Sequence, residues 1–161
     1  MNRHYDTTMF RNLCQDIRAI FDHATITTDV MVGFPLESDA DFQKSLEFVK
    51  EIRFEKVHVF PYSAREGTKA ASMPQLPKSV KDERAHIMIE ETEKIRKNFL
   101  KDEIGKIFSI IIESEKHDHH HVGYTKNYIP VHVKCSENSI GELVKVQITD
   151  SKKDYCIGEL L

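Results

Sequence analysis

The sequence has no long apolar segment and no excess of basic residues, and each lack excludes a class of protein. No apolar run approaches the ~20 residues that a membrane-spanning helix needs, and the first residues lack the apolar core of a signal peptide. We therefore expect a cytoplasmic protein that has no membrane partner. With a net charge of −3, any contact with RNA must depend on local patches and base stacking rather than on a global positive field.

Cysteine is also scarce, which bears on disulfides and on metal sites. Cys14, Cys135 and Cys156 lie far apart, and neither a CxxC nor a CxxxCxxC spacing occurs. We therefore expect free thiols rather than a disulfide framework. The histidine-rich stretch 117–121 is expected to form a solvated turn between strands, because a zinc site usually takes spaced ligands from more than one element.

What is present begins with two apolar segments, residues 24–33 and 56–62, which end in Gly, Pro or Ser and flank a helical pattern. The order strand, helix, strand predicts a βαβ unit, which crosses over right-handed into a parallel sheet. In such folds the ligand site lies beyond the carboxyl ends of the strands, which are here Gly33-Phe34-Pro35 and Tyr62-Ser63-Ala64-Arg65.

Helical patterns surround this unit. Thr7 or Thr8 is expected to cap a helix running to about Phe21, which carries an apolar stripe of Phe10, Leu13, Ile17, Ile20 and Phe21. Ser38, with Asp41 three residues later, predicts a capping box at the next helix. A longer helix is expected over about 79–103.

After Gly105 the periodicity changes from helical to two. The strand candidates are 107–113, 121–124, 129–133, 143–149 and 155–160. Five strands without a helix predict a small all-β, OB-like barrel, so the chain as a whole is predicted to be α/β followed by a five-stranded barrel. The first ~100 residues contain only two clear strands, which is too few for a complete parallel sheet and leaves its edges unpaired. Either it pairs with something else, or the chain is the tail of a longer protein.

Several residues are candidates for binding, each with a structural alternative. Gly33-Phe34-Pro35 allows a ligand to approach the backbone, or it is a plain turn. The segment 60–68 combines aromatic rings, a hydroxyl and the Arg65 guanidinium, which suits a nucleoside, or it is a packed loop. The segment 123–128 is either an RNA stacking platform, worth ~1–3 kcal/mol per stacked base, or a turn with tyrosines packed on the barrel.

Three segments, 27–35, 58–70 and 123–128, resemble a known family. In this order they are similar to the C-terminal part of a radical-SAM tRNA methylthiotransferase. Residues 58–63 most resemble the subgroup that modifies N6-threonylcarbamoyladenosine in tRNA (MtaB-like). Leu36 departs from the family, which usually has glycine there, so the turn after Pro35 is expected to be less permissive.

The resemblance implies that residues 1–98 are the C-terminal portion of a radical-SAM barrel and residues 99–161 a TRAM domain that binds RNA. Met1 is then expected to be an internal methionine of the family. S-adenosyl-L-methionine and 4Fe–4S clusters serve the full-length family in adding a methylthio group to C2 of the adenosine. This chain lacks the cluster-binding cysteines, so it is expected to be inactive alone and to need the missing N-terminal part.

The resemblance also implies site residues. The adenosyl group of S-adenosylmethionine would lie near Gly33, Phe34, Phe60 and Tyr62, with Arg3 near the mouth. The tRNA anticodon stem-loop would face Arg65, Tyr124, Lys126, Asn127 and Tyr128. Two other hypotheses stay open: a stand-alone RNA-binding module, and an unrelated small α/β enzyme whose pockets are completed in a dimer. A cysteine-rich reading frame with CxxxCxxC just upstream would favour the methylthiotransferase fragment.

Overall fold

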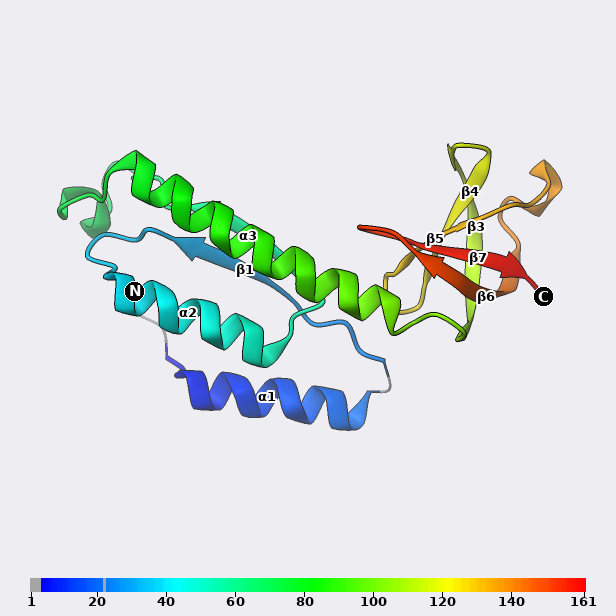
Figure 1. The fold of residues 1–161 in the computed structure, drawn as a ribbon, viewed down its shortest axis with the longest axis horizontal. Coiled ribbons are helices and arrows are strands. Elements are labelled where there is room, and N and C mark those ends of the chain that lie inside the picture. The colour runs from blue at the N-terminus through cyan, green and yellow to red at the C-terminus, as the bar shows by residue number, and fades with distance from the viewer. Residues whose placement is uncertain (1–3, 22) are drawn as a thin grey trace. The chain divides into compact units, whose positions relative to one another are not determined.

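The computed structural model describes residues 4–21 and 23–161, which divide into two compact units, Met1–Ile95 and Arg96–Leu161 (Figure 1). The first unit is α/β, and the second is built around a β-barrel. Among the helices in the described ranges, none is long and apolar enough to cross a membrane.

The first unit contains the predicted βαβ unit. Strand β1 (Thr27–Val32), helix α2 (Asp39–Ile52) and strand β2 (Lys56–Pro61) follow one another, and the two strands pair in parallel. The unit also contains α1 (Thr7–Ile20), the 3-10 turn η1 (Lys69–Ser72) and most of α3 (Lys78–Lys101). This confirms the α/β prediction and places both strand ends, the predicted site, at the same edge of the sheet.

Helix α2 provides most of the core of this unit. Its buried side chains recur at helical spacing and pack with Val32, Phe54 and Met88; they are Phe42, Leu46, Val49 and Ile52. Each such burial contributes about 1.5–3 kcal/mol. The predicted capping box is confirmed, because Ser38 Oγ accepts from the Asp41 amide while the Asp41 carboxylate accepts from the Ser38 amide, both at 3.1 Å.

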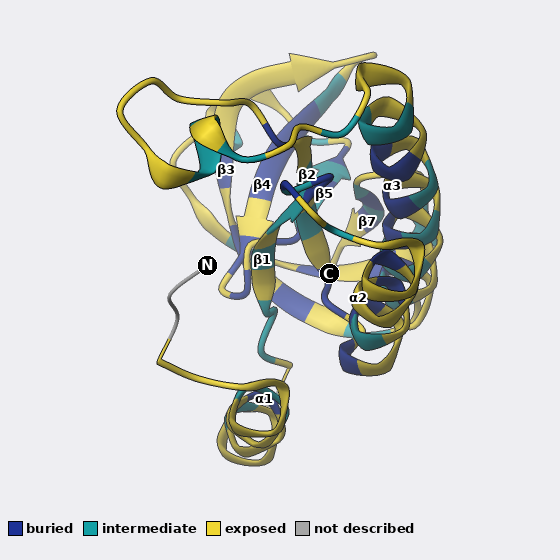
Figure 2. Ribbon diagram, turned by 90° about the vertical axis from the view of Figure 1, so that its left-hand side faces the viewer, coloured by how far each residue is buried: buried dark blue, intermediate teal, exposed yellow. Residues whose placement is uncertain are grey.

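Helix α1 differs from the prediction in its cap and in its buried side. Asp6, rather than Thr7 or Thr8, is the N-cap, because its carboxylate accepts from the Met9 amide at 2.8 Å. Much of the apolar stripe is exposed, because Leu13, Ile20 and Phe21 are 56%, 72% and 60% exposed; Figure 2 shows most of α1 in the colour of exposed residues. The buried side is narrow because Phe10 packs against aromatic rings of the α2 region, and the sheet in the described residues offers only two strands to cover.

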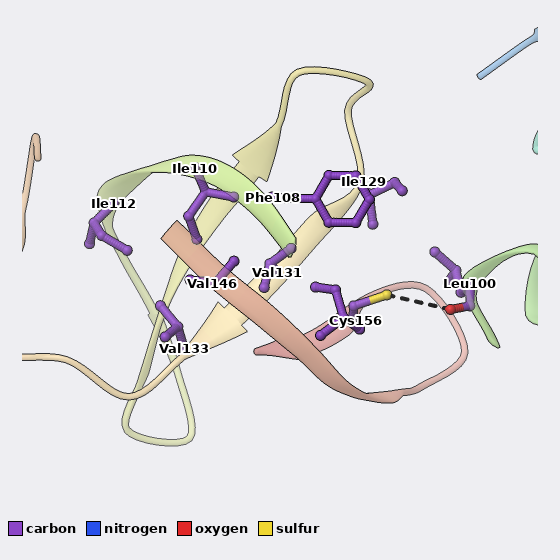
Figure 3. Packing of buried hydrophobic residues seen from close by; sticks show 10 residues of the cluster. Leu100, Phe108, Ile110, Ile112, Ile129, Val131, Val133, Val146 and Cys156 are labelled. Atoms are coloured by element: carbon purple, nitrogen blue, oxygen red, sulfur yellow. Dashed lines mark hydrogen bonds between the residues drawn. The ribbon is translucent and has the colours of Figure 1, made fainter. Parts of the chain in front are cut away.

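The second unit is a closed five-stranded barrel, as predicted, with strand order β3-β4-β5-β7-β6. Its strands are β3 (Ile107–His117), β4 (His120–Thr125), β5 (Pro130–Val133), β6 (Leu143–Ser151) and β7 (Cys156–Leu160), and the 3-10 turn η2 (Glu137–Ser139) precedes β6. Alternate side chains fill the interior, among them Ile110, Val131 and Val146, which are fully buried (Figure 3). The Cys156 thiol lies 3.8 Å from the Leu100 carbonyl oxygen, which accepts its weak hydrogen bond.

The histidine-rich stretch forms less of a turn than predicted. Strand β3 continues to His117 and β4 begins at His120, and these two residues pair across the hairpin. Asp118 and His119 alone form the turn, with φ of 45° and 65°. The two strands extend because the two-residue turn with positive φ matches the twist of the flanking strands. His117 and His120 are therefore strand residues with defined neighbours.

Candidate functional site

The first candidate site lies where β1 ends. Gly33 has a φ of +71°, which favours glycine. A Cβ added there would lie 2.4 Å from Cγ of Lys81 in α3. The Gly33 amide donates to the Glu37 carboxylate at 3.0 Å, so a residue of the following turn holds this backbone in place. The glycine is thus required both by the backbone angle and by the close approach of α3.

Arg84 of α3 forms hydrogen bonds to the same turn. Its side chain is only 6% exposed and donates to the Glu37 carboxylate at 2.7 Å and to Asp39 at 2.6 Å. Burial alone would lower the pKa of Arg84, but the hydrogen bonds to Asp39 and Glu37 outweigh burial and raise that pKa. The guanidinium therefore stays charged and holds the start of α2 and the β1 turn together.

Two aromatic rings meet at the strand ends. Phe34 and Tyr62 pack edge to face, with ring centroids 5.2 Å apart and an interplanar angle of 72°. The Tyr62 amide donates to the Val32 carbonyl at 2.8 Å, and Lys81 Nζ donates to the Tyr62 carbonyl at 3.2 Å. Tyr62 is 7% exposed, and its buried hydroxyl finds no hydrogen-bond partner within the described residues. A ligand with an acceptor or donor at this edge would satisfy it.

The other predicted residues of this site are not all part of one cluster. Phe60 is 41% exposed and pairs in register with Met31; it alternates with Val59, which packs on the helices, so it lies on the opposite face of the sheet. Arg65 is exposed, and its carbonyl accepts from the Thr68 hydroxyl at 2.7 Å. Arg3 lies outside the described residues.

The turn after Pro35 forms in spite of the leucine. Leu36 has a φ of 67° and is 64% exposed. A non-glycine residue in this left-handed region costs roughly 1–2 kcal/mol. The departure from the family pattern therefore leaves strain in the turn without abolishing it.

The second candidate site is the turn between β4 and β5. Thr125 closes it: its amide donates to the Ile129 carbonyl at 3.1 Å, and its hydroxyl accepts from the Ile129 amide at 2.9 Å. The Thr125 hydroxyl also lies 2.6 Å from Oδ1 of Asn127, to which it donates. Asn127 is 9% exposed, so its side chain serves the turn rather than the surface.

The same turn projects Tyr128 and Lys126 outward. Tyr128 is 83% exposed at a φ of 61°, and its amide donates to the Thr125 carbonyl at 2.9 Å. Tyr124 is 39% exposed on the adjoining strand. A large ring held in a strained, exposed position suggests a role in binding. We call Tyr124, at the end of β4, and Lys126 and Tyr128, in the turn that follows, the tyrosine turn.

Sequence reasoning missed two groups of residues. The clamp of Glu37 and Arg84 joins positions 47 residues apart, and nothing local in the sequence links them. The stacked rings of His117, His132 and Tyr155 come from β3, from β5 and from the loop before β7. Both groups join residues that are distant in the sequence, so only the three-dimensional structure reveals them. The sequence shows just one part of them, the run of histidines at 117–121.

The TRAM domain family model matches residues 101–161. Over its whole length the chain is 34% identical to a tRNA-2-methylthio-N(6)-dimethylallyladenosine synthase of Caldicellulosiruptor saccharolyticus, of which it covers 35%. It is also 34% identical to the threonylcarbamoyladenosine tRNA methylthiotransferase MtaB of Bacillus subtilis, of which it covers 37%. A solved structure, the apo form of Mycoplasma genitalium RNase R, matches 53% of the chain and 20% of its own with 12% identity and a TM-score of 0.32, too low to support any inference.

The chain thus spans about a third of the length of these curated relatives. The similarity runs through both units and is equally high for relatives whose names give two different modified adenosines, so it does not distinguish between these substrates. Residues 101–161 are thus a TRAM domain, and along its whole length the chain matches the C-terminal part of tRNA methylthiotransferases.

Proposed function

We propose that this chain is the C-terminal part of a tRNA methylthiotransferase that acts on N6-threonylcarbamoyladenosine next to the anticodon. Residues 1–98 contribute the last part of a radical-SAM barrel, and residues 99–161 hold the tRNA. One structural observation carries the RNA-binding half of the proposal: the closed barrel presents Tyr128, 83% exposed, on a turn fixed by hydrogen bonds.

The tyrosine turn has the properties of a base-stacking platform. Its rings are exposed, and Lys126 beside them is exposed as well. Because the whole chain has a net charge of −3, phosphate contacts alone cannot supply much affinity. Stacking on aromatic rings tolerates any base and contributes about 1–3 kcal/mol per base. The tyrosine turn therefore suits an unpaired loop of RNA such as the anticodon loop.

The first unit supports the proposal of a partial barrel. Strand β1 pairs with β2 on one side, and no other strand of residues 4–21 and 23–161 pairs with it. A cleft of about 600 Å³ lies beside this free edge, lined by Tyr5, Phe10, Thr28, Val30 and Phe48 among others. A further parallel strand would satisfy the edge and cover the cleft. We infer that the N-terminal part of the enzyme supplies it.

S-adenosylmethionine would fit the strand ends. The Tyr62 hydroxyl, buried and without a partner among the described residues, and the ring of Phe34 could receive its adenosine group. When bound, S-adenosylmethionine supplies the methyl group and the precursor of the deoxyadenosyl radical. Within this chain, Glu37 and Arg84 position the Gly33 turn, and Phe34 and Tyr62 exclude water from it.

A 4Fe–4S cluster does not fit the residues present. No three His, Cys, Asp or Glu side chains of the described ranges gather closely enough to hold a metal ion. Cys14 and Cys156 are buried in different units, 2% and 0% exposed. A cluster needs several thiolates at one place. We infer that the chain alone carries out no methylthiolation.

Binding of a fluorescent anticodon stem-loop, followed by anisotropy at two salt concentrations, tests the RNA-binding proposal. Tyr128→Ala should weaken binding by about 1–3 kcal/mol, and Lys126→Ala should reduce the salt slope by about one. Tyr5→Ala, which removes a 52% exposed tyrosine of the first unit, and Lys145→Ala on β6 are the matched controls. Unchanged affinity of Tyr128→Ala would overturn the proposal.

The substrate type needs its own measurement. Transfer RNA retained by the purified chain is digested to nucleosides and analysed by mass spectrometry. The proposal expects enrichment of N6-threonylcarbamoyladenosine over dimethylallyladenosine, relative to the input pool. Equal recovery, or the reverse enrichment, would contradict the threonylcarbamoyladenosine assignment while leaving RNA binding intact.

A further inference from the structure

Three ring side chains form a stack on the barrel. His117 ends β3, His132 lies in β5, and Tyr155 precedes β7. The His132 ring lies 3.8 Å from the Tyr155 ring at an interplanar angle of 12°, and 5.4 Å from the His117 ring at 4°. Near-parallel rings at these distances form stable offset stacks. The stack is therefore a preorganised surface built from strands β3 and β5 and from the residue that precedes β7.

The stack lies on the outer face of the barrel, together with Tyr124. His132 alternates with Val131 and Val133, which are fully buried in the interior, so its side chain faces outward. Val122 of β4 pairs in register with His132. Tyr124, two residues further along β4, belongs to the same face. His132 and Tyr124 thus both face outward, on the neighbouring strands β5 and β4.

A pocket lies at the end of β5, where Lys134 follows His132 by two residues. The pocket has a volume of about 230 Å³ and is lined by His120 and Lys134, among others. Lys134 is exposed and forms no ion pair with any residue in the described part of the chain. Glu159, which also lines the pocket, is the acidic neighbour. The pocket therefore offers room and a lysine opposite a glutamate, and none of the three stacked rings lines it.

We propose that the stack of His117, His132 and Tyr155 is a second nucleobase platform, which takes an unpaired RNA nucleotide with its base against His117 and its phosphate near Lys134. The inference deepens the proposed RNA binding and rests on it. His117 is the end ring and its side chain is 57% exposed, so one of its faces is open to a further ring. Bases stack on such rings without regard to sequence.

The charge state of the central ring favours stacking. Burial lowers the pKa of His132, and the neighbouring imidazoles of His117 and His120, when protonated, lower it further, against the smaller opposing effects of Glu115 and Asp118. His132 is therefore neutral near pH 7.5, and Tyr155 and His117 pack on an uncharged imidazole.

Binding of a 2-aminopurine-labelled, unstructured oligoribonucleotide to the whole chain tests the inference, with the anticodon stem-loop run in parallel. His117→Ala should weaken binding about fivefold or more and should abolish quenching of the 2-aminopurine. His117→Phe, which restores a ring, should recover both. His119→Asn is the matched control, because it removes an exposed neighbouring imidazole while asparagine tolerates the left-handed backbone of that turn.

The outcomes separate this inference from the proposal on which it rests. If Tyr128→Ala loses affinity while His117→Ala binds and quenches like the wild type, the second platform is wrong and RNA binding stands. If neither RNA binds the wild type, both are wrong. Adenosine monophosphate binding as tightly as the oligoribonucleotide, with the same dependence on His117, would overturn RNA as the occupant in favour of a free nucleotide.

Discussion

Arg84 donates a hydrogen bond of 2.7 Å to the carboxylate of Glu37, and the same Glu37 oxygen accepts from the Gly33 amide at 3.0 Å. One oxygen atom thus joins helix α3 to the turn that ends β1. Asp39, at 2.6 Å from Arg84, adds the start of α2 to the same contact. The geometry of the strand ends consequently depends on a residue that is remote in sequence.

Replacing Arg84 by methionine should destabilise the first unit by about 2–4 kcal/mol, because Glu37 then loses its cation while its side chain stays only 13% exposed. Urea unfolding followed by circular dichroism of the helices measures this. Lys78→Met, at an exposed ion pair with an N–O distance of 4.0 Å, should change the stability by less than about 1 kcal/mol. Equal effects of the two substitutions would argue against the clamp.

Leu36→Gly should stabilise the first unit by about 0.5–1 kcal/mol. Glycine removes the strain of the positive φ at this position, and its greater freedom in the unfolded chain offsets part of the gain. Little apolar burial is lost because Leu36 is 64% exposed. Leu36→Ala retains a Cβ and should show no such gain. A loss of stability in Leu36→Gly would mean that the leucine side chain makes a contact that matters.

The two buried thiols should report separate unfolding of the two units. Burial raises the pKa of Cys156 to about 11 and also raises that of Cys14, so neither should react quickly at pH 8 while its unit is folded. Cys14 should become reactive at lower denaturant, because a two-stranded sheet is less stable than a closed barrel. Pulse alkylation with mass spectrometry resolves both sites. Identical midpoints would show one cooperative unit.

The barrel should lose stability as the pH falls below about 6.5, the ordinary pKa of histidine. The pKa of His132 is lowered in the folded state, so the unfolded chain takes up the proton first and stability decreases toward acid. Above that pH both states are neutral and the full stability is present. His132→Phe should flatten the curve between about pH 7 and pH 5, whereas His119→Asn should not. NMR titration of a His132 pKa above 6.5 would contradict this.

Local patterns predicted most of the elements. The capping box at Ser38 follows from two residues three apart, and it formed as expected because both partners are local. The cap of α1 was misplaced by one or two residues, since Asp6 and Thr7 are equally competent in sequence and the chain geometry selects the carboxylate. The outward face of α1 could not be predicted, because whether Leu13 or Ile20 is buried depends on which other elements are present.

The candidate site was predicted less completely than the fold. Phe34 and Tyr62 were singled out at strand ends, and parallel pairing brings them together at 5.2 Å. Asn127 belongs to the turn through its side chain, as the tendency of asparagine to form side-chain-bonded turns would suggest. The stack on His132 depends on strand register across the closed barrel, and the single extra stretch of β3 up to His117 decides it.

Every strand of the barrel pairs with two neighbours: β3 with β4 and β6, β5 with β4 and β7, and β6 with β7 as well as β3. A gene segment that encodes such a barrel can be fused to another gene, or separated from its original neighbours, without exposing an unpaired edge strand to which other proteins could bind. The preceding α/β segment leaves one edge of β1 unpaired in the described chain. Moving it alone would therefore expose that edge. Recombination in evolution should therefore move the barrel alone more often than the α/β segment alone.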